Sequence, residues 1–371
     1  MSNIKIETLT AVHIGSGETL QYGNDFVYGK SSEDNTAVFG IIDARKVMQL
    51  IGEENIDKWV TAIERKEATD EIVKVYAPKA KIEDYSKRTI LAWVAPRETD
   101  TLKEHIHNGL GVPYIPGSSI KGGIRTAILS SIAEASDNDI LKSRIINDRN
   151  RNKMSAKGVE THFFGKDPNS DIFRFLQVGD AYFGNEYEIA IRMVNINERE
   201  KQSFWDKSKS QLIEAICPGD KASFQLKLNI NLYECAEKSV HPLPECMRSI
   251  SNIFRTINKH TESLIKTEIE YWKERTADDE SGQVDVYLEK LDEIRVIVEQ
   301  CENGKSCILR IGHGSGWRFI TGAWSENLDI FYPLIVPASR PRNDVHANYD
   351  FPKTRRVDDE CELLGFVKLT V

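Results

Sequence analysis

Residues 114–135 read YIPGSSIKGGIRTAILSSIAEA, and this stretch predicts a turn followed by an amphipathic helix. Pro116 and Gly117 mark the turn. The two serines that follow can cap a helix, in which isoleucines recur at positions 124, 128 and 132. The start of a helix offers unpaired backbone N–H groups and the positive end of the helix dipole. The stretch therefore fits a contact with a polyanion, and it fits equally well a plain helix cap with ordinary surface charges.

Alternating sequences predict strands on both sides of this helix. Apolar and polar residues alternate from Ile4 to Ile14 and again from Phe224 to Leu232. Helical spacing in residues 250–264 and 284–298 predicts two further helices. Strands with one polar face favour antiparallel sheets covered on one side. The predicted fold class is α+β, with two ferredoxin-like (RRM-like) domains, antiparallel sheets, glycine-rich loops and insertions.

The predicted domain boundary lies near residue 215. Residues 1–215 form an N-terminal RRM-like domain with insertions, and residues 216–371 form a C-terminal one. Residues 77–108 are mixed and polar, and we interpret them as an excursion from the core fold. A chain of 371 residues fits two domains of ordinary size.

Composition limits the location and the chemistry. The sequence has no apolar run near the roughly 18 residues of a membrane span and no signal-peptide pattern at its start, so we expect a cytoplasmic protein without a membrane partner. The six cysteines are scattered without a CxxC pair, which predicts no metal site and no disulfide framework. No cofactor is expected.

Charge is distributed unevenly along the chain. The formal net charge is -8, and residues 262–302 hold 13 acidic against 5 basic residues, so this segment accounts for the whole excess. Basic side chains gather in residues 142–157 and 340–356, which could contact phosphates or be solvated loops.

Three glycine-bearing loops carry the functional prediction. The first is HIGSG at 13–17, the second is PGSSIKGG at 116–123, and the third is GHGSGW at 312–317. Lys121 and Arg125 are four residues apart on the predicted helix, so both can reach one phosphate chain. Trp317 could stack a base, but a core position is the commoner role for a tryptophan, and we favour it.

These loops resemble those of the RAMP superfamily of CRISPR proteins. The resemblance rests on TLTAVHIGSG at 8–17, YIPGSSIKGGIRTAIL at 114–129, FFGKDP at 163–168 and IGHGSGWRFITG at 311–322. PKTRRV at 352–357 and LLGFVKL at 363–369 narrow it to the fifth Csm-family subunit of type III-A effector complexes.

The resemblance implies a non-catalytic, crRNA-binding subunit that caps the crRNA 3′ side of the Csm filament. It also implies a role in crRNA maturation and antiviral defence. The implied partners are crRNA, target RNA close by, and other Csm subunits, chiefly the repeated backbone subunit. The RNA-facing residues implied by motif match are His13, Gly15, Ser16, Gly17, Ser118, Ser119, Lys121, Gly122, Arg125, His313, Gly314, Ser315, Arg355 and Arg356; no residue is implied to be catalytic.

Two other functions stay open at this point. Some RAMP proteins cleave RNA without a metal, and His13 with Lys121 could supply a general base and a cation for such an endoribonuclease. The acidic helices in residues 262–302 could instead face a basic protein partner, although a solvated face is the commoner explanation.

Overall fold

The structure is a computed structural model that describes residues 2–65, 67–146, 155–184, 188–198, 203–320, 322–339, 351–352 and 354–371. Much of the two basic stretches predicted to contact phosphates, including residues 147–154 and 340–350, lies outside the described residues. The strands are β1 (Ser2–Thr8), β2 (Gly15–Gln21), β3 (Phe26–Lys30), β4 (Ala37–Ile42), β5 (Ser86–Ala92), β6 (Thr101–His105), β7 (Tyr114–Ile115), β8 (Leu176–Val178), β9 (Ala181–Tyr182), β10 (Glu188–Asn197), β11 (Trp205–Ile216), β12 (Lys221–Leu228), β13 (Ser306–Arg310), β14 (Thr354–Asp358) and β15 (Phe366–Thr370). The α-helices are α1 (Ala44–Ile51), α2 (Ile56–Glu64), α3 (Thr69–Tyr76), α4 (Gly117–Glu134), α5 (Asn138–Ile146), α6 (Lys157–Phe164), α7 (Ile230–Ala236), α8 (Ile250–Lys273), α9 (Gln283–Glu299) and α10 (Val336–Ser339).

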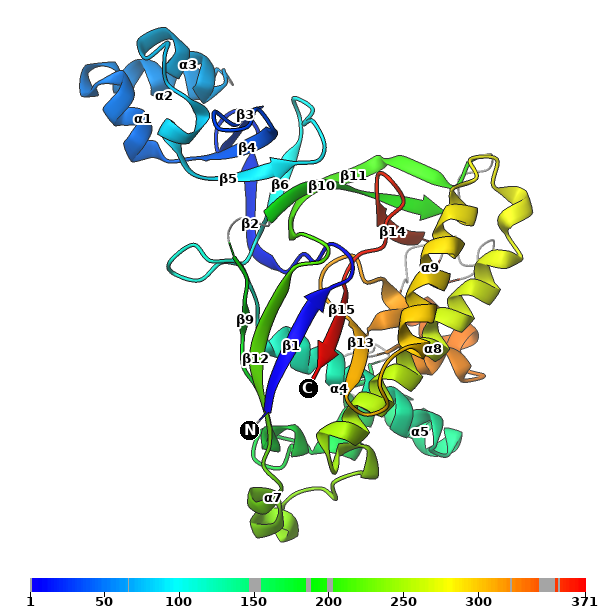
Figure 1. Ribbon diagram of the computed structural model, residues 1–371. Helices are drawn as coiled ribbons and strands as arrows, with labels where there is room; N and C mark the ends of the chain where they lie inside the picture. Colours follow the sequence, from blue (N-terminus) through cyan, green and yellow to red (C-terminus); the bar gives the residue numbers. More distant parts are fainter. Residues whose placement is uncertain are drawn as a thin grey trace.

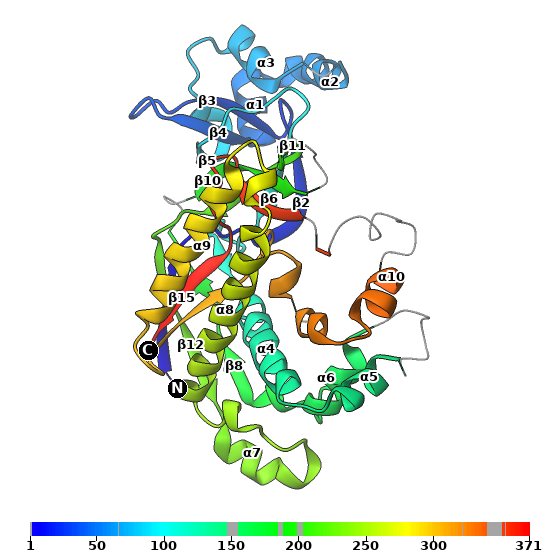
Figure 2. The ribbon, with the colours of Figure 1, turned by 90° about the vertical axis from the view of Figure 1, so that its right-hand side faces the viewer.

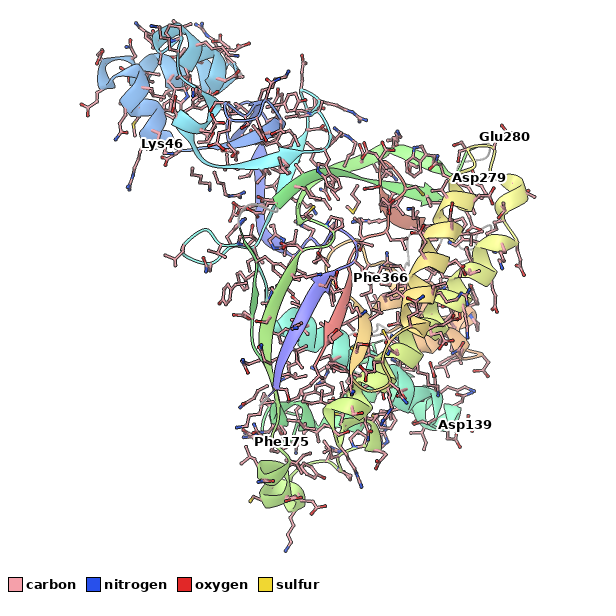
Figure 3. The ribbon with its side chains drawn as sticks, in the orientation of Figure 1. Lys46, Asp139, Phe175, Asp279, Glu280 and Phe366 are labelled. Carbon is pink, nitrogen blue, oxygen red and sulfur yellow. The ribbon has the colours of Figure 1, made fainter. Side chains whose placement is uncertain are left out.

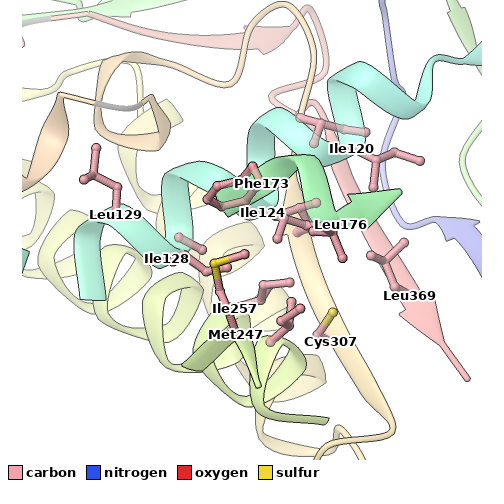
Figure 4. Close-up of a cluster of buried hydrophobic side chains, with 14 of the residues drawn as sticks. Ile120, Ile124, Ile128, Leu129, Phe173, Leu176, Met247, Ile257, Cys307 and Leu369 are labelled. Atoms are coloured by element: carbon pink, nitrogen blue, oxygen red, sulfur yellow. The ribbon is translucent and has the colours of Figure 1, made fainter. Parts of the chain in front are cut away.

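The first sheet has five strands in the order β13-β15-β1-β12-β8, and each strand is antiparallel to its neighbours. Ile4 lies opposite Phe224 in the register of β1 with β12, so the predicted apolar alternation faces one side. Long helices α4 and α8 cover that side (Figures 1 and 2). Figure 4 shows the resulting core, where Ile124 and Ile128 of α4 meet Ile257 of α8 and Leu369 of β15.

Two predicted strands end earlier than their alternation suggested. β1 stops at Thr8, because the amides of both Leu9 and Thr10 donate to the carbonyl of Phe366 and turn the chain out of the sheet. β12 stops at Leu228, and the chain then forms α7, in which Leu232 is exposed rather than buried in a strand.

The second sheet runs in the order β2-β6-β11-β10-β5-β4-β3, with β14 paired to β10. The interpretation of residues 77–108 as an excursion is wrong in part, since β5 and β6 from this stretch lie inside the sheet. Helices α1–α3 form a small separate core at one end of it, around Val47, Trp59 and Val73 (Figure 1). Asp43 caps α1 by accepting from the amides of Arg45 and Lys46.

The fold is therefore mixed α/β, with two main sheets, one antiparallel and one mixed, and a two-stranded antiparallel pair of β7 and β9. The division near residue 215 stays a prediction, but it does not separate the two sheets. The five-stranded sheet combines β1 and β8 from the first range with β12, β13 and β15 from the second, and both sheets contain strands from both ranges.

Candidate nucleic-acid interface

The first and third glycine loops, almost 300 residues apart in sequence, lie against each other. The amide of His313 donates to the carbonyl oxygen of His13 at 2.9 Å. Gly312 has a φ of 82°, and a Cβ at this position would lie 2.6 Å from the same carbonyl oxygen. Only glycine satisfies both the positive φ and the close approach, so this residue joins the two loops.

A pocket of about 240 Å³ opens at this junction. Its wall combines the first loop and β2 with Lys103 of β6 and His313 of the third loop. The lining residues are His13, Gly15, Gly17, Glu18, Thr19, Lys103, Glu104 and His313. Lys103 was not predicted, because its strand lay in the stretch that we interpreted as an excursion. Residues 101–105 read TLKEH with Leu102 as the single apolar residue, so no local alternation marks this strand.

The two histidines of this pocket are neutral near pH 7. Burial lowers the pKa of His13 to about 4, in spite of its hydrogen bond to the backbone of Glu214. Burial, with the nearby Arg356 guanidinium, likewise lowers the pKa of His313 to about 4. The rings are 5.7 Å apart between centroids. Nη1 of Arg356 lies 2.8 Å from Nε2 of His313, which must therefore accept the hydrogen bond.

Arg88 organises a buried acidic cluster behind the pocket. Its guanidinium donates to the carboxylate of Glu214, and its Nη2 donates to Oε1 of Glu104 at 3.0 Å. His107 Nε2 lies 2.6 Å from Oε1 of Glu188 at the same cluster. Glu104, His107 and Glu214 are close enough together to hold a metal ion, but the Arg88 cation already lies against two of the three. The cluster therefore acts as an ion-pair support for the pocket wall.

The second loop begins α4, next to the third loop. A Cβ at Gly123 would lie 3.0 Å from side-chain atoms of both Leu309 and Ile311, so the helix packs closely on the strand end that precedes Gly312. Gly117 donates its N–H to Oδ1 of Asp180 at 2.7 Å, which means that a carboxylate already occupies the start of this helix. Ser118 and Gly122 are exposed, while Ser119 and Lys121 are half-buried.

Arg125 is engaged within the protein. Its guanidinium pairs with Glu160 at 3.1 Å and with Asp171 at 2.9 Å. It also lies over the rings of Phe164 and Phe173, 4.5 and 4.9 Å from their centroids. These contacts hold α4 against α6 and against the turn before β8. We therefore assign Arg125 a structural role, although it lies one turn from Lys121 on the same helix.

This assignment predicts that Arg125→Ala destabilises the fold without changing the electrostatics of RNA binding. We expect a loss of about 1–3 kcal/mol in the free energy of unfolding, because two part-buried carboxylates lose a charged partner. Urea denaturation measures the loss, and the salt dependence of RNA binding should match the wild type. A shallower salt dependence would restore Arg125 to the set of phosphate ligands.

The remaining predicted residues divide between the surface and the core. Ser16 is exposed and donates to Oε2 of Glu104 at 3.1 Å, beside the pocket. Gly314 and Ser315 are buried, and Gly314 has a φ of 92° and no room for a side chain beside Leu364. Trp317 packs on Phe331 and Phe351, as expected for a core residue.

Arg355 and Arg356 are adjacent on β14 but point to opposite sides. Arg355 is 5% exposed and donates to the carboxylate of Glu268, so we leave it out of the proposed contact set. Arg356 is exposed and reaches His313 at the pocket. Strand alternation explains this difference, since neighbouring side chains on a strand face opposite sides.

The acidic segment forms the antiparallel helices α8 and α9 at the side of the molecule (Figure 1). Asp279 and Glu280 lie at the outer end of this hairpin (Figure 3). Several acids pair within the hairpin, including Glu262 with Lys266 and Asp292 with Arg295. The excess charge therefore lies away from the glycine-loop pocket. Within the described ranges, no helix is both long enough and apolar enough to cross a bilayer.

The family model of the RAMP superfamily matches residues 5–319, so this chain belongs to the RAMP superfamily. Within it, the chain is similar to the CRISPR-system protein Csm5 of Methanocaldococcus jannaschii, with 26% identity over 289 residues. That match covers 65% of this chain and 66% of the relative.

Two solved structures share the fold. A chain of the type III-A Csm-crRNA-target RNA ternary complex, determined by cryo-electron microscopy, has a TM-score of 0.70 at 18% identity and covers 100% of both chains. The crystal structure of T. onnurineus Csm5 has a TM-score of 0.69 at 16% identity, covering 98% of this chain and 99% of that one.

Proposed function

We propose that this chain is a crRNA-binding subunit of a type III-A CRISPR effector complex, in the position that Csm5 occupies. The similarity to Csm5 and to a chain of a Csm-crRNA-target RNA complex supports this proposal. Its partners are crRNA, target RNA nearby and the other Csm subunits, chiefly the repeated backbone subunit. The subunit caps the crRNA 3′ side and supports crRNA maturation. We also infer that β1, α4, β8, β12, α8 and β15 form one ferredoxin-like unit, because this order of elements matches a split β-α-β pattern.

One observation carries the RNA-binding role: two glycine loops and Lys103 line a single pocket, and a second cation, Arg356, contacts the His313 ring in its wall. Glycines 15 and 17 leave the backbone of the first loop exposed. Lys103 and Arg356 approach from β6 and β14, with His313 between the loop and Arg356. Exposed backbone amides with cations beside them suit a phosphodiester chain. Glu104 also lines the pocket, but Arg88 pairs with it, and Glu18 lies at the exposed rim.

We propose that the subunit is non-catalytic. His13 and His313 are close enough to suggest an endoribonuclease, and this geometry makes cleavage the second candidate. Cleavage without a metal needs a general acid as well as a general base. Both histidines are neutral near pH 7, so neither is a proton donor of the imidazolium type. His13 could serve as a base, but the accepting nitrogen of His313 is occupied by Arg356. The pair supports binding better than proton donation.

The double variant Lys103→Ala/Arg356→Ala tests the proposed RNA site. We expect the full-length protein to bind single-stranded RNA roughly tenfold more weakly, because two charge-assisted contacts are lost. The slope of log K against log salt should become shallower by about 1.4, at roughly 0.7 for each phosphate contact on a single strand. Binding is measured by fluorescence anisotropy at several salt concentrations.

The matched control is Lys259→Ala/Arg248→Ala, which removes the same two charges from exposed positions, one on α8 and one just before its first turn. It should bind like the wild type. The same variants, tagged and co-expressed with the other Csm subunits and crRNA, should show reduced and normal crRNA recovery respectively. Equal RNA binding by both double variants would reject the pocket, and shortening of the RNA by the purified wild-type chain would favour the endoribonuclease.

A further inference from the structure

The His13 side chain presents an unused hydrogen-bond acceptor to the pocket. Its Nδ1 lies 2.5 Å from the backbone carbonyl oxygen of Glu214. A carbonyl only accepts, so Nδ1 must carry the proton, and in the neutral ring Nε2 then holds a lone pair. Nε2 has no hydrogen-bond partner among the residues that the structure describes. Only 2% of the His13 surface is exposed, yet Nε2 is not among the fully enclosed unpartnered atoms of the described residues, so it is reached from the pocket that His13 lines.

The local backbone keeps Nε2 reachable. A Cβ at Gly15 would lie 3.3 Å from Nε2, which is close enough to cover it. A Cβ at Gly17 would have no neighbour within 4 Å, so the space beyond Gly15 is open. The acceptor therefore lies at the inner wall of the 240 Å³ pocket, behind a residue that lacks a side chain.

The occupant of this position must donate a hydrogen bond. A phosphodiester has only acceptors, and the cations that suit it, Lys103 and Arg356, lie at the side of the pocket. In a nucleotide chain held there, the nearest donor to a bound phosphate is the ribose 2′-hydroxyl, which deoxyribose lacks.

We propose that Nε2 of His13 accepts a hydrogen bond from the 2′-hydroxyl of the nucleotide whose phosphate Lys103 and Arg356 hold, and that this contact selects RNA over DNA. The inference rests on the proposed RNA-binding function and adds its specificity. Protonation would abolish the acceptor, but burial disfavours the charged ring, so the acceptor persists at neutral pH. DNA lacks the 2′-hydroxyl, so a DNA complex would leave this acceptor without a donor. The missing hydrogen bond weakens DNA binding relative to RNA binding.

The test measures the ratio of the dissociation constants of the full-length protein for single-stranded DNA and for RNA of the same sequence. We expect His13→Ala to lower this ratio roughly fivefold to tenfold, almost entirely through weaker RNA binding. RNAs with one 2′-deoxy nucleotide at each position in turn sharpen the result. The wild type should lose affinity at one position, and His13→Ala should be insensitive to that same substitution.

Gly15→Ala is the second variant, because it covers Nε2 while leaving the buried ring and its bond to Glu214 in place. It should lower the ratio of the DNA to the RNA dissociation constant in the same way, and it provides the test if His13→Ala folds poorly. Lys103→Ala is the matched control, since it should weaken RNA and DNA equally and leave the ratio unchanged. Two results would overturn this inference. One is that His13→Ala and Gly15→Ala weaken RNA and DNA binding equally, and the other is that no 2′-deoxy substitution changes the affinity of the wild type. In either case a weaker binding of RNA by Lys103→Ala would still support the RNA site. Failure of the Lys103 and Arg356 variants to affect RNA would instead overturn the proposed function.

Discussion

Glu268→Gln is expected to lower the free energy of unfolding by about 3–5 kcal/mol, a large part of the stability of a typical domain. Glu268 lies on α8 with only 1% of its surface exposed. It accepts from Arg318, which follows the third glycine loop, and from Arg355 of β14. The hydroxyl of Tyr287 and the indole of Trp272 donate to the same carboxylate, at 3.0 and 3.3 Å.

The Glu268 carboxylate stabilises the fold through its negative charge and not through its shape. Burial alone would raise the pKa of Glu268, but the guanidinium groups of Arg355 and Arg318 outweigh it and hold the pKa at about 2. Glutamine keeps the size and leaves two guanidiniums in the core without their shared anion. Arg318 retains the carboxylate of Glu326 at 2.8 Å, whereas Arg355 retains backbone carbonyls and the rings of Tyr271 and Trp272 but no carboxylate, so Arg355 loses most.

Chemical denaturation of Glu268→Gln beside Glu270→Gln measures this effect. Glu270 lies two residues further along α8 and is exposed, so its variant should stay within about 0.5 kcal/mol of the wild type. Adding Arg355→Gln to Glu268→Gln should recover part of the loss, because it removes the stranded charge. A loss below about 1 kcal/mol for Glu268→Gln would mean that water, and not the carboxylate, balances the two arginines. Because β14 also carries Arg356, RNA affinity should fall together with stability.

Acidification from pH 6.5 to pH 4 is expected to destabilise the fold by several kcal/mol. Burial lowers the pKa of His13 and of His260 to about 4, and that of His105 to about 3. The folded-state pKa lies below the unfolded value of about 6.5 in each case, so the contribution to stability is full above pH 6.5 and is lost as the pH falls. A shift from 6.5 to 4 corresponds to roughly 3 kcal/mol for each histidine.

Asp358 is a carboxyl that acts in the opposite direction. Burial raises the pKa of Asp358 to about 6, so its folded form takes up a proton first and gains stability between pH 6 and pH 4. This offsets roughly one of the three histidines, and a net loss remains.

His260→Leu isolates one of these groups. Burial is the only cause of the low pKa of His260, and the residue lies on α8 away from the pocket. Urea denaturation at pH 7, 5.5 and 4.5 should give a shallower fall in unfolding free energy for this variant than for the wild type. Identical pH dependence in both proteins would show that His260 is solvated and titrates normally.

The three longest helices and several strands were predictable, because their signals are local. The isoleucines at positions 124, 128 and 132 predicted α4, and helical spacing predicted α8 and α9. The exceptions have specific causes. β5 and β6 were missed because a strand held between other strands can carry polar side chains, and the end of β12 was misjudged because Ile230 and Leu232 continue the alternation within α7.

The candidate site was predictable only in pieces. The first and third loops were identified separately, and Arg356 came with a motif at the end of the chain. Their meeting at His13 and His313, the arrival of Lys103 and the support from Arg88 depend on the pairing of strands far apart in sequence. The pairing of Arg125 with Asp171 and of Arg355 with Glu268 likewise joins residues 46 and 87 positions apart, and sequence spacing carries no sign of either.

By itself, then, the sequence determined that helices and alternating strands are combined in this chain, that long helices lie over an antiparallel sheet and where glycines turn the backbone, because periodicity and backbone freedom belong to neighbouring residues. Tertiary structure alone decided which loops share a pocket and which arginines face solvent or core. It also decided that the His13 ring is neutral and presents a hydrogen-bond acceptor to the pocket. These properties depend on burial and on partners brought from distant strands, and they exist only after the sheets have paired.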